Sequence, residues 1–204
     1  MKSIIASLLC LVALADDWYL DPHGELDAPI IGQEEAYEQS HHKHKKYPEM
    51  SKDMHRWGYT WDAYKVHTDD GYILTTFRIT GNKRKEVTPD PSLNPVVIMH
   101  GLGCDATSWI YDFGPVVLPI PLHLFDRGFD VYMAANRGTK YCQKHETLAV
   151  DDPAFWAFSW TEMGLQDDIS NIKKISKHTG KKVSYIGVSQ GTVQMFYALA
   201  KAED

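Results

Sequence analysis

The chain of 204 residues has 44% hydrophobic residues and a formal net charge of -6. It is long enough for one domain with a sizeable core and too short for two comfortable ones. Acidic and basic residues are interspersed along it, so no basic patch indicates a nucleic-acid surface. We therefore expect one main domain and no nucleic-acid partner.

The N-terminus has the features of a secretory signal peptide. Lys2 precedes a short apolar run, and Ala13-Leu14-Ala15 supplies a small-x-small cleavage site before Asp16. A buried helix or a membrane anchor is the alternative, but the run is shorter than the about 20 residues that a bilayer core requires. We expect residues 1–15 to be removed, no transmembrane segment to remain, and a secretory-pathway protein that is extracellular or lysosomal.

Residues 16–56 are polar, and we predict that they form a leader or linker before a domain at 57–204. The His41–Lys46 cluster could bind a metal, but no ligand spacing fixes a geometry, which favours a solvated segment. Cys104 and Cys142 remain once Cys10 leaves with the signal. They either form one disulfide or stay unpaired, and the sequence alone does not decide between these alternatives.

The predicted domain opens with a β-hairpin. Two β-rich runs, 64–68 and 72–80, flank Asp69-Asp70-Gly71, whose Asp-Gly pair supplies the positive φ of a tight turn. The charged stretch 81–94 contains two prolines and is predicted to be a surface loop. A continuous apolar run at 95–100 follows, of the kind that fills a central strand covered on both faces.

Further strands and a helix complete an α/β pattern. Apolar runs at 129–134 and 182–186 predict two more strands. Between them, Ser159 and Glu162 have the spacing of a capping box, isoleucines repeat at helical intervals, and Gly180 is placed to end the helix. Alternating strands and helices predict right-handed crossovers and a parallel sheet between helices, so the fold class is α/β.

A nucleophile elbow is predicted where the last strand meets a helix. Gly187-Val188-Ser189-Gln190-Gly191 is a G-x-S-x-G sequence between a predicted strand and the helical stretch 193–201. Gly187 and Gly191 are expected because the turn is too tight for side chains there, and Ser189 is expected in a strained conformation. The alternative is an ordinary strand-to-helix turn that has no catalytic role.

A second glycine-rich turn supports the catalytic interpretation. His100-Gly101-Leu102-Gly103 ends the first central strand. Hydrolases with a nucleophile elbow place a backbone N–H of the oxyanion hole at this position. An ordinary turn is again the alternative. Two such elements at the carboxyl ends of two strands, in the expected order, favour an enzyme.

These motifs together resemble the acid lipases, the group that includes gastric and lysosomal acid lipase. The resemblance covers roughly residues 57–201, and its matching pieces are Gly58-Tyr59, Thr68 to Leu74, His100-Gly101-Leu102, Ala106 to Trp109, Gly128 to Val131, Asn136-Arg137-Gly138, Phe155 to Trp160, Glu162-Met163, Thr179-Gly180-Lys181 and Gly187 to Thr192.

The resemblance implies an incomplete α/β-hydrolase fold with Ser189 as the nucleophile. It further implies the backbone N–H groups of Leu102 and Gln190 as the oxyanion hole, a triacylglycerol or sterol ester substrate at a lipid–water interface, and no metal or organic cofactor. The sequence departs from the family at Val188, where His is usual, and at Gly103-Cys104-Asp105, which replaces a more apolar stretch. Both departures bear on acyl-chain preference.

The acid and the base of a catalytic triad are not expected within the chain. In this fold they follow the serine, whereas all ten histidines precede Ser189. Our first hypothesis is a serine hydrolase of lipid esters whose chain is truncated before the triad Asp and His, the later strands and the lid. The 204 residues alone would then be inactive. A peptidase or thioesterase is a weaker variant, and the alternative from another class is a secreted, non-catalytic binding module.

Overall fold

The computed structural model describes residues 46–111 and 118–201. The expected signal peptide and the histidines of the 41–46 cluster lie outside the described residues. Within the described ranges, no helix is long and apolar enough to cross a membrane.

The first helix, α2 (Pro48–Trp57), corrects the expected domain boundary. Proline at its first position suits a helix start, because that N–H would lack a partner in any case. Met50, Met54 and Trp57 follow the i, i+4, i+7 spacing of one helix face, and both methionines are fully buried. Residues 48–56 therefore belong to the folded core, and the prediction of a polar leader as far as residue 56 is wrong for them.

The predicted hairpin is present and longer than expected. Strands β1 (Tyr59–His67) and β2 (Ile73–Asn82) pair antiparallel along their whole length. Gly71 has a φ of +95° in the connecting turn, as the Asp-Gly pair predicts. Thr68 closes the turn, because its hydroxyl donates to Asp70 and accepts from the Tyr72 N–H.

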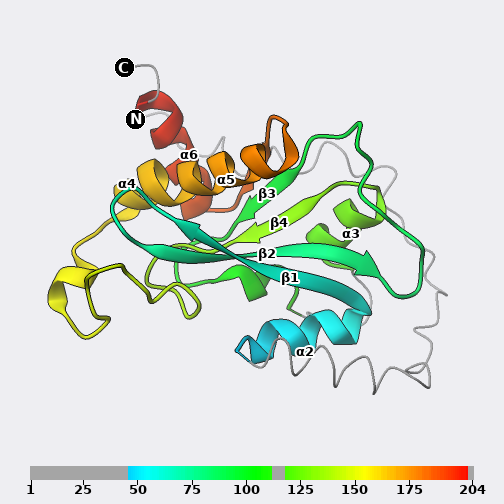
Figure 1. The fold of residues 1–204 in the computed structure, drawn as a ribbon, viewed down its shortest axis with the longest axis horizontal. Helices are drawn as coiled ribbons and strands as arrows, with labels where there is room; N and C mark the ends of the chain where they lie inside the picture. Colours follow the sequence, from blue (N-terminus) through cyan, green and yellow to red (C-terminus); the bar gives the residue numbers. More distant parts are fainter. Residues whose placement is uncertain (1–45, 112–117, 202–204) are drawn as a thin grey trace, which may run out of the picture.

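The remaining three strands are short. They are β3 (Val96–Met99), β4 (Val131–Ala134) and β5 (Ser184–Gly187), and the five-stranded sheet has the order β1-β2-β4-β3-β5 (Figure 1). β5 forms the edge of the sheet opposite the hairpin. β3 lies parallel to both β4 and β5, while β2 joins β4 antiparallel. The predicted α/β class is confirmed, with the antiparallel hairpin at one edge of the sheet.

Helices connect the parallel strands. The link from β3 to β4 contains η2 (Ala106–Trp109) and α3 (Ile120–Asp126), a helix that was not predicted from the sequence. The link from β4 to β5 contains η3 (Pro153–Trp156) and then α4 (Trp160–Glu162), η4 (Met163–Asp168) and α5 (Ile169–Thr179) in direct succession. The capping box at Ser159 and the left-handed Gly180 are confirmed, but η4 is a π-helical turn that was not expected. Helix α6 (Gln190–Lys201) follows β5.

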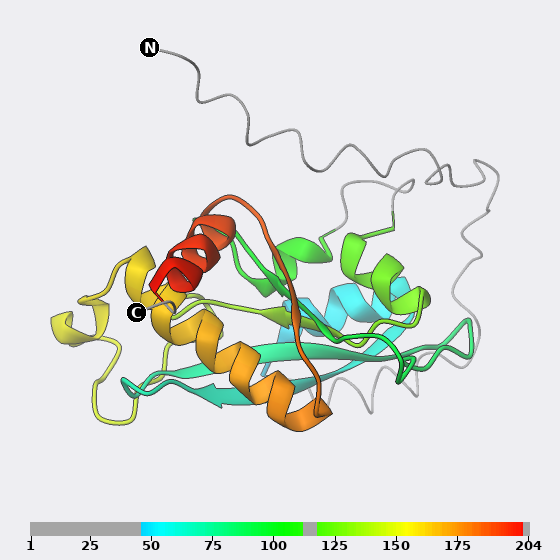
Figure 2. The same cartoon turned by 90° about the horizontal axis from the view of Figure 1, so that it is seen from above.

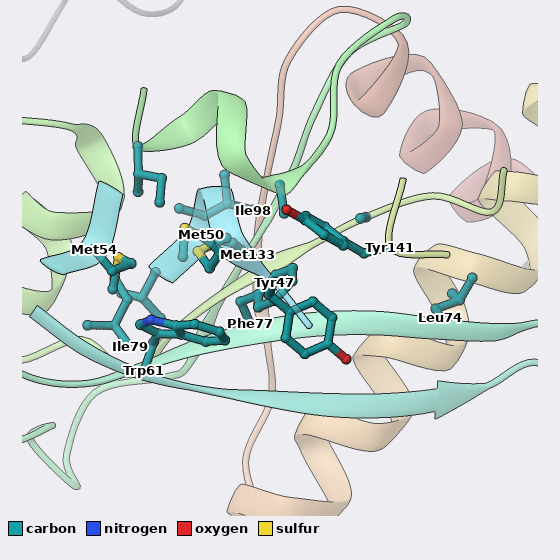
Figure 3. Close-up of a cluster of buried hydrophobic side chains, with 14 of the residues drawn as sticks. Tyr47, Met50, Met54, Trp61, Leu74, Phe77, Ile79, Ile98, Met133 and Tyr141 are labelled. Atoms are coloured by element: carbon teal, nitrogen blue, oxygen red, sulfur yellow. The ribbon is translucent and has the colours of Figure 1, made fainter. Parts of the chain in front are cut away.

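Alternate residues of the central strands pack on opposite faces of the sheet. Ile98 and Met133 point into a large core with α2 and α3, whereas Val97 and Tyr132 pack against Ile175 of α5. Figure 2 shows α5 on one side of the sheet and α2 and α3 on the other. The larger core contains an aromatic cluster of Tyr47, Trp61, Phe77 and Tyr141 (Figure 3).

The edge at β5 is open within the described residues, and the helix that follows it exposes apolar side chains. β5 pairs only with β3 within the described residues. On α6, Val193, Phe196 and Leu199 are 48%, 67% and 56% exposed. An apolar edge of this kind is an aggregation liability.

Candidate active site

Ser189 has the backbone conformation expected of a nucleophile elbow. It lies two residues after the end of β5 and immediately before α6, and its φ is +52°. It is the one non-glycine residue with a positive φ in ranges 46–111 and 118–201. Such a conformation costs of order 1–3 kcal/mol and persists only where the surroundings enforce it.

The two flanking glycines are required by close backbone contacts. A Cβ on Gly187 would lie 2.7 Å from the carbonyl carbon of Gly191 and 2.7 Å from the Thr192 nitrogen. A Cβ on Gly191 would lie 2.7 Å from the His100 oxygen and 2.8 Å from the Met99 oxygen. Distances under 3.0 Å to backbone atoms leave no room for a side chain, so the first turn of α6 approaches the end of β3 as closely as a backbone can.

The turn after β3 lies beside the serine. β3 and β5 are parallel neighbours, so their carboxyl ends meet at one edge of the sheet. A Cβ on Gly101 would lie 3.1 Å from Cβ and 3.6 Å from Oγ of Ser189. The structure thus brings the Leu102 turn together with Ser189 and Gln190, as the sequence predicted. No backbone hydrogen bond of the Leu102 or Gln190 N–H is found among the described residues.

A cavity of about 640 Å³ opens over these two turns. Its volume is in the range of small-molecule sites, roughly 300–1,000 Å³. Leu102 and Gln190 line it, together with apolar side chains from three other segments: Tyr111, Trp156, Phe158 and Met163. Leu102 is 78% exposed at this site. The serine elbow therefore adjoins a largely apolar depression that could receive an organic ligand.

His100 begins the turn that lies beside the elbow, and both of its ring nitrogens are engaged in hydrogen bonds. Nε2 lies 3.1 Å from the Asn136 backbone nitrogen, and Nδ1 lies 2.8 Å from the Gly101 oxygen. Burial lowers the pKa of the ring, which keeps it neutral. The Ser189 hydroxyl has no hydrogen-bond partner among the described residues. His100 is therefore not placed to act as the base for Ser189.

A buried ion-pair network that sequence reasoning missed fixes the loop after β4. The Arg137 guanidinium is 1% exposed and binds Asp70 of the hairpin turn (Nη1 to Oδ2, 2.6 Å) and Asp167 of η4 (Nε to Oδ1, 2.8 Å). The pKa of Asp70 is lowered by its hydrogen bonds to Arg137 and Thr68, which outweigh burial. No local pattern marks Arg137 as the centre of this network, because its partners lie 67 and 30 residues away in the chain.

Cys104 and Cys142, the two cysteines within ranges 46–111 and 118–201, are both unpaired. Cys104 is exposed beside the cavity, whereas Cys142 is buried between β2 and the loop after β4. Burial raises the pKa of the Cys142 thiol to about 12, so this thiol is inert. Of the two alternatives left open by the sequence, the structure has the unpaired thiols.

Comparison with known families agrees with this geometry. The family described as the partial alpha/beta-hydrolase lipase region matches residues 50–112, and the alpha/beta hydrolase fold matches residues 94–204. The second match alone covers more than half of the chain. The chain therefore belongs to the α/β-hydrolase fold family.

The relatives narrow this class. Human lysosomal acid lipase/cholesteryl ester hydrolase is 39% identical over 147 residues, which are 71% of this chain and 36% of that protein. Lipase member M of Mus musculus is 41% identical over 147 residues, 70% of this chain and 33% of that protein. Lipase lipl-3 of Caenorhabditis elegans is 39% identical over 152 residues, 72% and 36% respectively. The resemblance to the acid lipases is confirmed, and the chain spans about a third of the length of these relatives.

Proposed function

We propose that this chain carries the nucleophile and the oxyanion hole of a serine hydrolase that cleaves lipid carboxylic esters in lipid catabolism. One observation carries the proposal. Ser189 is held at a φ of +52° next to two backbone N–H groups, of Leu102 and Gln190, for which the described residues offer no partner. A binding module would gain nothing from such a strained turn, whereas an acyl-transfer enzyme uses it to expose a nucleophile.

The chemistry follows from these positions. Ser189 Oγ attacks the ester carbonyl, and the negative charge that develops on the carbonyl oxygen is stabilised by the N–H groups of Leu102 and Gln190. The partial positive charge at the N-terminus of α6 adds to this stabilisation. A base takes the proton of the serine hydroxyl and passes it to the departing alcohol. Water, deprotonated by the same base, then hydrolyses the acyl-enzyme and releases the carboxylic acid.

The base is the part that the described residues do not provide. Since both nitrogens of His100 are engaged, we propose that a histidine and an acidic residue from outside residues 1–204 complete the triad, in the order usual for this fold. The chain matches only about a third of the length of its relatives, which is consistent with this proposal.

The substrate class is proposed from the cavity and from the relatives. Aromatic and apolar side chains, among them Trp156, Phe158 and Met163, suit an acyl chain. One relative is named a cholesteryl ester hydrolase and others are named lipases. We therefore propose a triacylglycerol or sterol ester as substrate, presented at a lipid–water interface, in a protein of the secretory pathway that is extracellular or lysosomal.

The test uses Ser189→Ala in the longest naturally produced protein that contains this chain. We expect loss of ester hydrolysis and of labelling by a serine-directed phosphonate, because removing the nucleophile commonly costs several orders of magnitude in rate, roughly 10⁴-fold or more. Ser92→Ala is the matched control, since Ser92 is exposed in the loop that enters the opposite end of β3. Activity in Ser189→Ala close to that of Ser92→Ala would rule out the assigned nucleophile.

The proposed incompleteness is tested on residues 16–204 alone. Without a base the serine hydroxyl is a weak nucleophile, so turnover of a short-chain nitrophenyl ester should not exceed that of the same fragment with Ser189→Ala by more than a small factor. Robust Ser189-dependent turnover would show instead that the fragment contains its own base.

A further inference from the structure

Three polar side chains are buried directly beneath the elbow. His100, Asn136 and Gln194 are each 2% exposed or less, and they come from the turn after β3, the loop after β4 and the second turn of α6. Buried polar groups are costly unless their hydrogen bonds are satisfied, so each of them requires a defined set of partners.

Hydrogen bonds join the three residues into one chain. The Asn136 and Gln194 side-chain amides exchange two hydrogen bonds, of 3.1 Å and 2.9 Å. The Asn136 backbone N–H donates to His100 Nε2 at 3.1 Å. Because a backbone N–H can only donate, Nε2 is the acceptor, and the proton of the neutral ring lies on Nδ1, which donates to the Gly101 oxygen at 2.8 Å.

This last hydrogen bond orients the Leu102 N–H. The Gly101 carbonyl and the Leu102 N–H belong to the same planar peptide and point in opposite directions. Holding the carbonyl oxygen against His100 therefore fixes the direction of the N–H. The Gly101 oxygen also accepts from the Cys104 N–H at 3.3 Å, so the shorter His100 hydrogen bond is one of two that hold this peptide.

The other end of this hydrogen-bonded chain reaches the side chain of Gln190, the residue whose backbone N–H is the second proposed donor. Gln194 lies one helical turn after Gln190, and its Oε1 also accepts from the Gln190 side-chain amide at 3.4 Å. Gln194 thus binds the first turn of α6, whose N-terminal N–H is that of Gln190. One continuous set of hydrogen bonds therefore connects the Gly101–Leu102 peptide with the side chain of Gln190.

We propose that the His100–Asn136–Gln194 chain positions the oxyanion hole, by fixing the orientation of the Leu102 N–H relative to the Gln190 N–H. The inference rests on the proposed function, and it makes these three positioning residues and not catalytic ones. Donors held in place before reaction need no reorganisation when the oxyanion forms, and the water-free surroundings strengthen the hydrogen bonds that hold them.

The variant Gln194→Met tests the role of the His100–Asn136–Gln194 chain. The variant is made in the longest naturally produced protein that contains residues 1–204. Methionine nearly conserves the volume of glutamine and removes both of its hydrogen-bonding groups. The matched control is Thr76→Val, which deletes a buried hydroxyl that binds Asn171 on α5, away from the elbow. Gln194→Met leaves the Asn136 side-chain amide without its Gln194 partner and removes a 3.4 Å hydrogen bond to Asp168. Thr76→Val leaves the buried Asn171 Oδ1 without its Thr76 partner. Both variants should therefore lower the thermal unfolding midpoint.

Catalysis separates the two variants. For Gln194→Met we expect a fall in kcat of about 10- to 100-fold with KM changed less than about 2-fold, because a displaced donor weakens only the transition state. A trifluoromethyl ketone, whose adduct carries an oxyanion, should bind more weakly by a similar factor. Thr76→Val should retain kcat. An equal loss of kcat in both variants, or none in Gln194→Met, would overturn the proposal.

A measurement that needs no turnover keeps the inference separate from the proposed function. In ¹⁵N NMR spectra of the wild-type protein, His100 should be the neutral Nδ1–H tautomer, and Gln194→Met should shift the Leu102 and Gln190 amide signals. An Nε2–H tautomer, or unshifted amides, would overturn the positioning chain. A wild-type protein without Ser189-dependent hydrolysis would refute the proposed function, while these spectra would still decide whether the chain orients the Leu102 peptide.

Discussion

The two ends of the sheet are held together by different means. At the hairpin side, large aromatic side chains fill the space between the sheet and α2, with Tyr47, Trp61 and Tyr141 packing edge to face on Phe77 at centroid distances of 5.2, 5.4 and 5.5 Å. At the elbow, glycines bring backbone against backbone, and buried amides and an imidazole form the hydrogen bonds. The first region is stabilised by apolar volume and the second by a specific geometry.

This difference predicts separate consequences for substitutions. Apolar packing stabilises the fold in proportion to the surface that it buries, and it tolerates changes that conserve volume. Close backbone contacts and buried polar chains tolerate little, because a shift of about 1 Å at a catalytic group is enough to cost roughly 100-fold in rate. Core variants should therefore lose stability before activity, and elbow variants should lose activity at a modest cost in stability.

The largest effect on stability is expected for Phe77→Ala. Phe77 is fully buried at the centre of the aromatic cluster, and truncating a buried phenylalanine costs about 3–5 kcal/mol. Denaturant unfolding measures the loss. The kcat per folded molecule should stay within about 2-fold of wild type, because the substitution lowers the stability of the whole fold and leaves the transition-state contacts in place. A stable protein with a strongly reduced kcat would contradict the separation of the two regions.

Gly191→Ala should have a smaller effect on stability and a large effect on activity. Its Cβ would lie within 2.8 Å of two backbone oxygens at the end of β3, so α6 must move away. Overpacking of this kind costs about 1–3 kcal/mol, and the displaced elbow should lower kcat by about 100-fold. Unfolding curves measure the loss of stability, and ester hydrolysis measures the loss of kcat, both in the longest naturally produced protein that contains this chain.

Gly180→Ala is the control for this substitution. Gly180 has a φ of +71° at the end of α5, and a Cβ there would meet nothing within 4 Å. The backbone strain should cost about 1 kcal/mol without affecting kcat. If Gly191→Ala retained kcat as Gly180→Ala is expected to, the close backbone contact at Gly191 would not be required for activity.

The features that sequence predicted are those encoded by neighbouring residues. The Asp70-Gly71 turn, the Ser159 capping box, the Gly180 helix end and the Gly187–Gly191 elbow are local patterns, and each is present where expected. The chemical roles of Ser189, Leu102 and Gln190 remain predictions. Their proximity was predictable because parallel strands place their carboxyl ends at one edge.

The missed features depend on distant parts of the chain. Asn136, His100 and Gln194 are separated by 36 and 58 residues, so nothing local marks them as partners. The π-helical turn η4 lies against α6, where a Cβ on Gly164 would meet the Gln194 oxygen at 2.6 Å, and the packing of two helices is not visible in one helical repeat. Helix α2 could have been found, because Met50, Met54 and Trp57 repeat at helical intervals among polar residues.

The smallest effect is expected from comparing Ser189→Gly with Ser189→Ala. Neither variant has a nucleophile, so the comparison isolates the strain of a side chain at a φ of +52°. A left-handed conformation costs roughly 1–2 kcal/mol for a residue with a Cβ, and glycine loses about 0.5–1 kcal/mol through its greater freedom in the unfolded chain. The glycine variant should therefore be more stable by about 0.5–1 kcal/mol.

Denaturant unfolding of both variants measures this difference, and the same pair at Ser92 is its control. Ser92 is exposed and has no positive φ, so there the alanine variant should be as stable as the glycine variant or more so. A reversal of this order at position 189 alone shows that the elbow stores strain in the serine itself. If alanine were at least as stable as glycine at both positions, the positive φ of Ser189 would carry no cost, and the elbow would resemble the rest of the fold in being held without strain.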